Sequence, residues 1–214
     1  LLQRWLPVLE RCRSVWVRGP MSKALLAERG VRAEVLGDPA LVFARGASPQ
    51  RLRWRGDRPV LGLNVGTSHG HVWGGDEAAV ERAASELALA LLREGWRVEV
   101  YPLRSWDDGP CGRLCRRLPD ERVRLVRVDR LNPTAYLRRM EGVTVFVGMK
   151  LHSVALAHCR AVPSVMLEYR PKCRDYMASV GQEACTVRTD RLDVPALAER
   201  VRSLHAHRAE HAEA

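Results

Sequence analysis

The chain has 214 residues, of which 46% are hydrophobic and 28% charged, and its formal net charge is +10. This composition is typical of an ordinary globular protein with a core, and no apolar run approaches the roughly 18 residues of a membrane-spanning helix. The six cysteines form no Cys-x-x-Cys pair. Their spacing therefore indicates neither a structural zinc site nor a disulfide framework, and it favours a reducing, cytoplasmic compartment.

The positive charge raises the question of nucleic-acid binding. The arginines are scattered, and the dense cluster RLRWRGDR, residues 51–58, falls in a stretch that resembles a linker. A solvated arginine-rich surface is therefore the favoured interpretation, and no nucleic-acid partner is expected. Of 35 basic residues, three are lysines, Lys23, Lys150 and Lys172, and the last two follow apolar runs. Those two positions are candidates for sites that need an amine.

The first 59 residues contain a few short elements and then a linker. The chain begins with Leu inside an amphipathic pattern, so we expect a preceding N-terminal part of the protein to be missing. Residues 14–19 are predicted to form a strand, 20–30 a helix and 31–43 extended chain. Residues 44–59 are basic, contain Gly, Pro and Ser, and lack apolar periodicity, which is typical of a linker.

Strands and helices alternate in the rest of the chain. The expected strands are 60–66, 96–103, 123–128, 143–148, 163–169 and 185–190. The expected helices are 77–95, 112–118, 132–140, 153–159, 173–181 and 194–211. This alternation predicts an α/β fold with a mainly parallel sheet and right-handed crossovers. The nearly continuous apolar strands indicate a sheet that is covered on both faces.

Polar side chains follow two successive strands of this sheet. Lys150 and His152 follow the first, and Tyr169, Arg170 and Lys172 follow the second. Ligands of parallel sheets bind outside the carboxyl ends of the strands, where these loops meet. His152 also falls at the start of a helix, whose dipole favours anions. The edge is therefore suited to a small ligand with two anionic groups.

Each of these residues also has an ordinary structural explanation. A lysine after a strand is usually solvated, a histidine at a helix start can be a cap or a core residue, and a tyrosine can be packed with its hydroxyl in water. The functional interpretation gains weight because two successive strand ends carry the same kind of residue. His69 and His71 form a His-x-His pair, but no third ligand can be identified nearby in the sequence, so no metal site is expected.

Residues 143–181 resemble the polysaccharide pyruvyl transferase family. They carry its pattern of an apolar strand, Gly-x-(Arg/Lys)-Leu-His, a small-residue helix, a Val-Pro strand and Tyr-x-x-Lys. Residues 16–43 are similar to the family's Val-Arg-x-x-Ser helix and Asp-Pro-Ala-Leu segment. The resemblance implies two Rossmann-like domains that face a cleft, as in a GT-B glycosyltransferase, of which this chain is the C-terminal half.

The resemblance also implies boundaries between domains, a linker and a tail. Residues 1–43 would be the C-terminal remnant of the first Rossmann-like domain and 44–58 the linker. Residues 59–203 would be the second Rossmann-like domain, which carries the donor site, and 204–214 a frayed tail.

Members of the family transfer the enolpyruvyl group of phosphoenolpyruvate to a sugar of a cell-surface polysaccharide or its precursor. They form a pyruvate ketal and release phosphate. The resemblance implies phosphoenolpyruvate as co-substrate, no further cofactor, and a glycan or lipid-linked sugar as acceptor, in the cytoplasm. Peripheral membrane association and the oligomeric state stay open, as do the acceptor sugar and its linkage.

Site residues are carried over by position. His152 would be the general acid/base or a phosphate contact. The donor or anion contacts would be Lys150, Lys172, Arg18 from the first domain, Tyr169 and Arg170. Many members have Arg where this chain has Lys150, and an ammonium lacks the two-pronged contact that a guanidinium makes with a carboxylate or phosphate.

Two other functions stay open. One is a nucleotide-sugar-dependent GT-B glycosyltransferase, although the paired acidic residues that hold a nucleotide ribose are not evident and Glu168 stands alone near the expected site. The other is a domain that binds an anion or glycan without catalysis.

Overall fold

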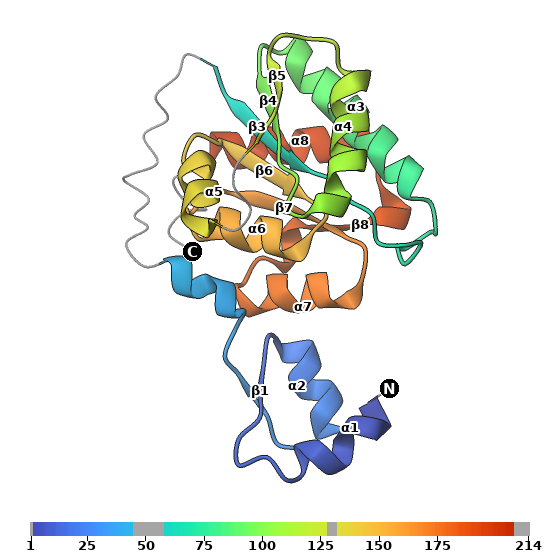
Figure 1. Cartoon of the computed structure of the whole chain (residues 1–214), viewed down its shortest axis with the longest axis vertical. Coiled ribbons are helices and arrows are strands. Elements are labelled where there is room, and N and C mark those ends of the chain that lie inside the picture. Colours follow the sequence, from blue (N-terminus) through green and yellow to red (C-terminus); the bar gives the residue numbers. More distant parts are fainter. Residues whose placement is uncertain (1, 45–57, 128–131, 208–214) are drawn as a thin grey trace.

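The computed structural model describes residues 2–44, 58–127 and 132–207. They form a larger α/β lobe around a six-stranded sheet and a smaller lobe from the N-terminal residues (Figure 1). Every neighbouring pair of strands in the large sheet is parallel. The α/β fold class with a parallel sheet is therefore confirmed.

The strand order places a ligand crevice near the centre of the sheet. The strands are β3 (Val60–Asn64), β4 (Arg97–Val100), β5 (Val123–Leu125), β6 (Val145–Gly148), β7 (Ser164–Glu168) and β8 (Thr186–Arg188). Their order across the sheet is β5-β4-β3-β6-β7-β8. The order reverses between β3 and β6, and doubly wound sheets bind ligands at the carboxyl ends of such strands. Both β3 and β7 are buried along their whole length, which explains their continuous apolar sequences.

Helices cover both faces of the large sheet. They are α3 (Glu77–Arg93), α4 (Asp108–Arg117), α5 (Pro133–Met140), α6 (Leu151–His158), α7 (Pro171–Ser179) and α8 (Val194–Ala206). Right-handed crossovers place α3 and α4 on one face, where α8 packs against α3, and α5, α6 and α7 on the other (Figure 1). Asp76, Asn132 and Asp193 cap α3, α5 and α8 by accepting hydrogen bonds from backbone N–H groups in the first turns.

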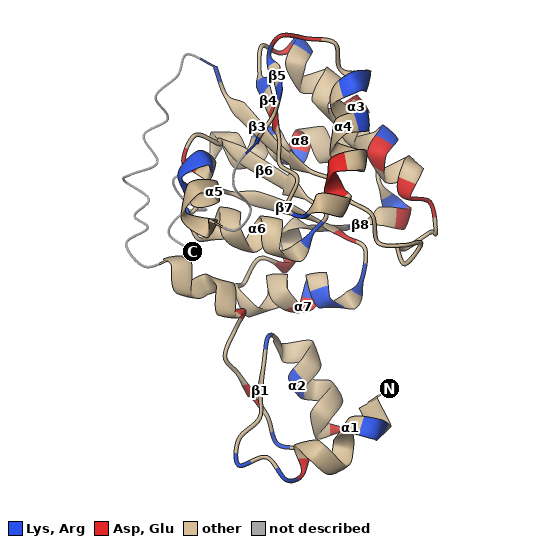
Figure 2. Ribbon diagram, in the orientation of Figure 1, with Lys and Arg blue, Asp and Glu red and all other residues tan. Residues whose placement is uncertain are grey.

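Many of the arginines form ion pairs with acidic side chains. Figure 2 shows Lys and Arg spread over several elements of both lobes, with Asp and Glu among them. Examples from the described part of the larger lobe are Arg82–Asp76, Arg113–Glu81, Arg122–Asp120, Arg139–Glu99, Arg174–Glu168, Arg188–Asp190 and Arg202–Glu94. Pairs in which both side chains are exposed, such as Arg202–Glu94, stabilise a fold by about 0–1 kcal/mol each. They compensate part of the positive charge locally.

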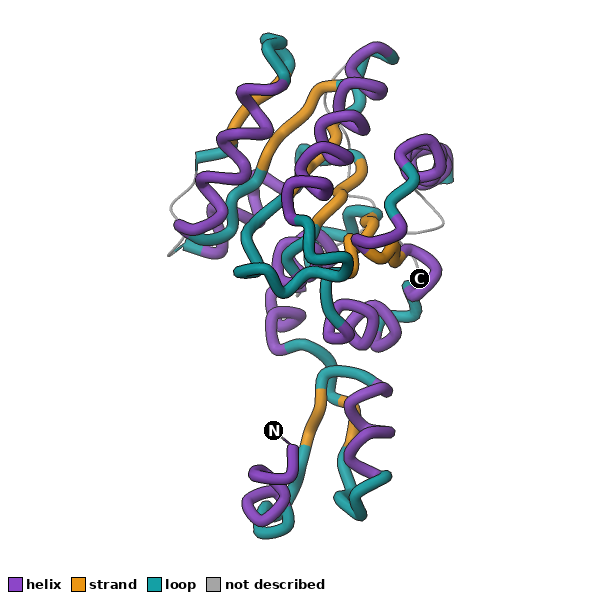
Figure 3. The backbone as a smooth tube through the Cα atoms, turned by 90° about the vertical axis from the view of Figure 1, so that its right-hand side faces the viewer, coloured by secondary structure: helices purple, strands orange, loops and turns teal. Residues whose placement is uncertain are grey.

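The smaller lobe consists of two helices and a two-stranded parallel sheet. Its elements are α1 (Leu2–Leu9), β1 (Trp16–Val17), α2 (Pro20–Ala27) and β2 (Glu34–Val35). The two strands pair side by side (Figure 3), and Leu26, Val31 and Ala33 form a small core beneath them.

The expectation of extended chain over residues 31–43 is wrong for its second half. Residues Pro39–Ala44 form a 3-10 helix, η1, whose Ala40 and Leu41 pack against the core of the larger lobe and which contacts α6. Asp38 starts this helix by accepting a hydrogen bond from the Ala40 N–H group at 2.9 Å. By its packing, η1 belongs with the larger lobe, although the sequence suggested a boundary at residue 43.

Several further boundaries differ from the sequence-based expectations, among them those next to the predicted site and at the expected tail. The helix α4 begins at Asp108 and follows a short 3-10 helix, η3 (Ser105–Asp107), and α6 begins at Leu151. The expected tail from residue 204 is wrong at its start, because α8 continues to Ala206 and Leu204 is buried in the core. Residues 45–57 of the expected linker and residues 208–214 lie outside the described part of the chain. No described helix combines the length and apolar composition that a membrane span requires.

Candidate active site

Asn64 joins the strands on either side of the crevice. It ends β3 and is completely buried. Its Oδ1 atom accepts a hydrogen bond from the Lys150 N–H group at 2.9 Å, and its Nδ2 atom donates to the Tyr101 carbonyl at 2.8 Å. Asn64 therefore fixes the loop that carries Lys150 relative to β4. A polar residue inside the apolar sequence VLGLNVG was the signal that could have identified it.

A cavity of about 380 Å³ opens at this edge of the sheet. Its walls are Arg18, Leu103, Arg104, Trp106, Asp107, Lys150, Leu151, His152, Tyr169 and Lys172. The structure thus brings together five of the six predicted site residues. The sixth, Arg170, is not part of the lining, and its Nε atom donates a hydrogen bond to the His71 carbonyl at 3.1 Å.

Two lysine ammonium groups lie beside one aromatic ring. The Nζ atoms of Lys150 and Lys172 are 5.5 and 5.0 Å from the ring centroid of Tyr169, which is buried. Both distances allow a cation–π interaction. Lys150 also donates a hydrogen bond to the Thr67 carbonyl. Burial lowers the pKa of Lys150, the Asp107 carboxylate opposes this effect, and the Lys172 charge adds to it. Two cations beside the same ring favour an anionic ligand near them.

Asp107 is the carboxylate that partly balances these lysines. It is completely buried, and its Oδ2 atom accepts hydrogen bonds from the N–H groups of Leu103 and Arg104 at 3.2 and 3.0 Å. Its Oδ1 atom is 3.9 Å from Lys150 Nζ. Burial raises the pKa of Asp107, and the Lys150 charge opposes this shift. Gly66 allows this close packing, because a Cβ atom there would be 2.1 Å from Asp107 Oδ1 and 2.5 Å from Lys150 Cε.

Arg18 and His152 both line the wall of the pocket, and both contact Asp38, which is not among the lining residues. Asp38 Oδ2 is 2.7 Å from Arg18 Nε and 3.7 Å from His152 Nε2. The Arg18–Asp38 contact is an ion pair without hydrogen-bond alignment. His152 lies in the first turn of α6, and its side chain is 48% exposed. Burial lowers the pKa of His152, and the Asp38 carboxylate opposes this effect. The wall therefore combines a cation with a titratable ring that a carboxylate contacts.

Comparison with known proteins identifies the family. The model of the polysaccharide pyruvyl transferase family matches residues 1–171 of the 214-residue chain. The chain belongs to the polysaccharide pyruvyl transferase family. This is the family that the motifs in residues 143–181 resembled. A search of curated proteins finds no match.

Two solved glycosyltransferase structures share the fold. A mutant O-GlcNAc transferase from Thermobaculum terrenum is 17% identical, with a TM-score of 0.52 over 93% of this chain and 40% of its own. The GtfA/B complex is 11% identical, with a TM-score of 0.56 over 98% of this chain and 42% of its own. The chain therefore spans about two fifths of the length of these structures. At such low identity the likeness shows the fold alone, which is GT-B-like.

Asp175 in α7 holds residues 17–22, at the start of α2, against the larger lobe. Its carboxylate accepts hydrogen bonds from the N–H groups of Met21 and Ser22 at 2.8 and 3.3 Å, and from Ser22 Oγ at 2.5 Å. The backbones of the two segments also approach closely at Gly19, where an added Cβ atom would be 2.1 Å from the Asp175 carbonyl oxygen. These contacts position Arg18, which immediately precedes them, on the wall of the pocket.

Glu77 orders the loop that follows β3. It accepts hydrogen bonds from Thr67 Oγ1 at 2.9 Å, from the N–H and Oγ groups of Ser68 at 2.5 and 2.6 Å, and from the Gly70 N–H group at 3.1 Å. Burial opposes ionisation, but these hydrogen bonds outweigh it and lower the pKa of Glu77 to about 2. His69 in this loop makes an edge contact with Trp106. Within the described ranges, no three His, Cys, Asp or Glu side chains gather as metal ligands would.

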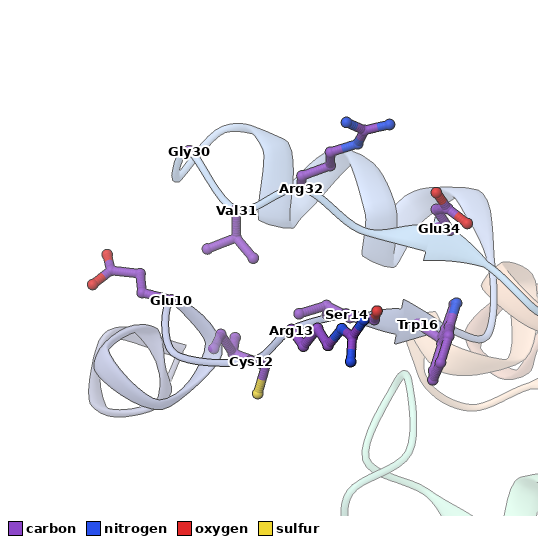
Figure 4. A pocket seen from close by; sticks show the side chains of 11 residues that line it. Glu10, Cys12, Arg13, Ser14, Trp16, Gly30, Val31, Arg32 and Glu34 are labelled. Atoms are coloured by element: carbon purple, nitrogen blue, oxygen red, sulfur yellow. The ribbon is translucent and has the colours of Figure 1, made fainter.

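A larger cavity lies in the smaller lobe but lacks convergent chemistry. It has a volume of about 500 Å³ and lies between the end of α1 and the entries to β1 and β2. Its charged side chains have mixed signs, and those of Glu10 and Arg32 point away from each other (Figure 4). The cavity at the carboxyl edge, where cations and a histidine converge, is therefore the candidate active site.

Proposed function

We propose that the protein transfers the enolpyruvyl group of phosphoenolpyruvate to two hydroxyl groups of a sugar in a cell-surface polysaccharide or its precursor. The product is a pyruvate ketal, and phosphate is released. The observation that carries this proposal is the convergence of Arg18, Lys150, His152 and Lys172 on one cavity of about 380 Å³. Membership of the polysaccharide pyruvyl transferase family supports the same reaction.

The charges of the pocket fit the donor. Phosphoenolpyruvate carries a carboxylate and a phosphate on a three-carbon skeleton, so it needs fixed cations on more than one side. Lys150 and Lys172 supply two ammonium groups next to Tyr169, and Arg18 supplies a guanidinium from the smaller lobe. The helices α6 and α7 also begin at the pocket, and their positive dipole ends favour anions there.

The reaction needs one proton at carbon and a stabilised leaving group. A sugar hydroxyl adds to C2 of the enolpyruvyl group while the methylene carbon C3 takes up a proton. A second hydroxyl then displaces phosphate from C2, and the second hydroxyl proton leaves with the phosphate. His152 is the pocket residue whose ordinary pKa suits proton transfer near neutral pH. The surrounding cations stabilise the charge of the departing phosphate.

Phosphate release tests this function. The protein is incubated with phosphoenolpyruvate, with and without a panel of hexose and N-acetylhexosamine glycosides. Release is expected only with a suitable sugar, and His152→Ala is expected to lower kcat at least ~100-fold. His207→Ala, at the end of α8, is the control that should retain activity. Equal phosphate release by both variants would contradict the assignment.

Nucleotide-sugar glycosyl transfer is the second candidate, because both solved neighbours have the GT-B fold. Glu168, the acidic residue that could hold a ribose, is ion-paired with Arg174 at 3.0 Å and does not line the pocket. Thermal stabilisation by UDP or GDP, but not by phosphoenolpyruvate, would favour this candidate. Binding of phosphoenolpyruvate without turnover on the acceptor panel would instead indicate a non-catalytic binding domain.

A further inference from the structure

We propose that Asp38 is a positioning residue of this site, whose Oδ2 atom contacts both His152 Nε2 and Arg18 Nε and stabilises the cationic form of the His152 ring. The kinetic part of this inference rests on the proposed pyruvyl transfer, whereas its structural part does not. Asp38 was not among the residues expected from the sequence, because it lies in a segment that was predicted to be extended. Its position became evident only from the packing of η1 on α6.

The Asp38 carboxylate has one oxygen that is bonded to the backbone and one that contacts two residues of the pocket wall. Its Oδ1 atom accepts a hydrogen bond from the Ala40 N–H group at 2.9 Å, which fixes the orientation of the side chain. Its Oδ2 atom is the one near His152 Nε2, at 3.7 Å, and near Arg18 Nε, at 2.7 Å. The Asp38 side chain is 1% exposed, whereas those of Arg18 and His152 are 31% and 48% exposed, so water screens these contacts in part.

A carboxylate beside one ring nitrogen of a histidine affects the protonation of the ring. It favours a proton on the nitrogen that it faces and stabilises the ring when it becomes cationic. At 3.7 Å the contact between His152 Nε2 and Asp38 Oδ2 is electrostatic and not a hydrogen bond, so Asp38 acts on the charge of the ring. Asp38 thus acts through His152 and not through direct contact with the reacting carbon.

The charges around His152 make the effect of Asp38 measurable. Arg18 from the smaller lobe, Arg104 after β4 and Lys172 in α7 all disfavour a cationic ring, whereas Asp38 favours it. Removing the Asp38 charge removes the group that counteracts the effect of these three positive charges on the His152 ring. The pKa of His152 should therefore fall further below its ordinary value, whether the histidine acts as an acid or as a base.

Asp38→Asn is the suitable variant, since the amide oxygen can still accept the hydrogen bond from Ala40. The protonation of His152 is followed by nuclear magnetic resonance across pH, and its signal is assigned by its absence in His152→Gln. The midpoint is expected to fall by ~0.5–1 pH unit, from the Coulomb energy of a partly screened charge pair. Asp120→Asn removes a charge before β5, at the opposite edge of the sheet, and should not shift it. Equal His152 midpoints in the two variants would overturn the proposal.

Kinetics supply the second readout. Asp38→Asn should lower kcat at least ~10-fold and move the His152-dependent limb of the pH profile to lower pH. The KM for phosphoenolpyruvate should not rise, because Arg18 keeps its charge and loses a competing anion. Asp38→Glu keeps the charge and should shift the midpoint of the His152 titration less than Asp38→Asn does.

The outcomes separate the two proposals. A loss of kcat with an unchanged pH profile would show a merely structural role and would overturn the assignment of Asp38. A shifted His152 midpoint in a protein that does not use phosphoenolpyruvate would leave the positioning role intact and reject the proposed function.

Discussion

Replacing Asp175 with Ala tests how the two lobes assemble one site. The change removes three hydrogen bonds that Met21 and Ser22 donate to a nearly buried carboxylate. Hydrogen bonds to a charged group each contribute about 1.5–3 kcal/mol. These three share one carboxylate and come from adjacent residues, so they do not add independently, and removing the carboxylate also removes its desolvation cost. The expected loss in the free energy of unfolding is about 2–3 kcal/mol.

Urea denaturation followed by circular dichroism measures this loss. The matched control is Asp193→Ala, which removes the exposed cap of α8 and a single hydrogen bond to the Ala196 N–H group. That control should lose about 1 kcal/mol, as is usual for a helix cap. Asp175→Ala should also weaken phosphoenolpyruvate binding, because Arg18 is no longer held at the pocket. If Asp175→Ala were no less stable than Asp193→Ala, the proposed role of Asp175 in docking the lobes would be refuted.

Two further substitutions test the loop after β3. Gly66→Ala should destabilise the protein by about 1–3 kcal/mol, because its Cβ atom would be 2.1 Å from Asp107 Oδ1. Gly109→Ala, whose nearest neighbour would be 3.5 Å away, is the control, and equal thermal midpoints would contradict the prediction. Glu77→Gln should cost about 1 kcal/mol at neutral pH, a value reduced for solvent screening because Glu77 is partly exposed. Since its pKa is lowered from 4.5 to about 2, the stability that Glu77 contributes is present above pH 4.5 and lost as the pH falls toward 2. A difference in thermal midpoint between Glu77→Gln and wild type that stayed constant over this range would contradict the prediction.

The site residues that the sequence predicted could be found from the order of strands and loops along the chain alone. Lys150, His152, Tyr169 and Lys172 each follow a recognisable apolar strand, and parallel strands must bring their carboxyl ends to one edge. Their convergence on one cavity needed no knowledge of side-chain contacts. Arg170 follows the same strand as Lys172, but its side chain turns toward the His71 carbonyl. Sequence order therefore places a residue at the edge without giving the direction of its side chain.

The residues that the sequence did not single out act through partners far away in the chain. Asp175 binds residues more than 150 positions earlier, and Asp38 contacts a histidine on α6. Asp107 is within reach of Lys150 only because β4 and β6 flank β3. No periodicity records such pairs, because they depend on tertiary packing.

The helical ending of the 31–43 segment escaped prediction for a related reason. The sequence DPALVF fits extended chain or a short helical turn equally well, and contact with α6 accompanies the helical form. The same packing places Asp38 beside His152. The error in the predicted element and the omission of Asp38 therefore have one cause.

Calorimetric titration with phosphoenolpyruvate tests most directly whether the pocket is a donor site. Wild-type protein should bind this ligand, and Lys150→Met should weaken the affinity at least ~10-fold, or about 1.4 kcal/mol, because it removes an ammonium while keeping a side chain of similar length. Lys23→Met, an exposed lysine of α2 outside the pocket, should bind as the wild type does. Absence of binding by the wild type, or equal affinities in the two lysine variants, would contradict a phosphoenolpyruvate site at the carboxyl edge of the sheet.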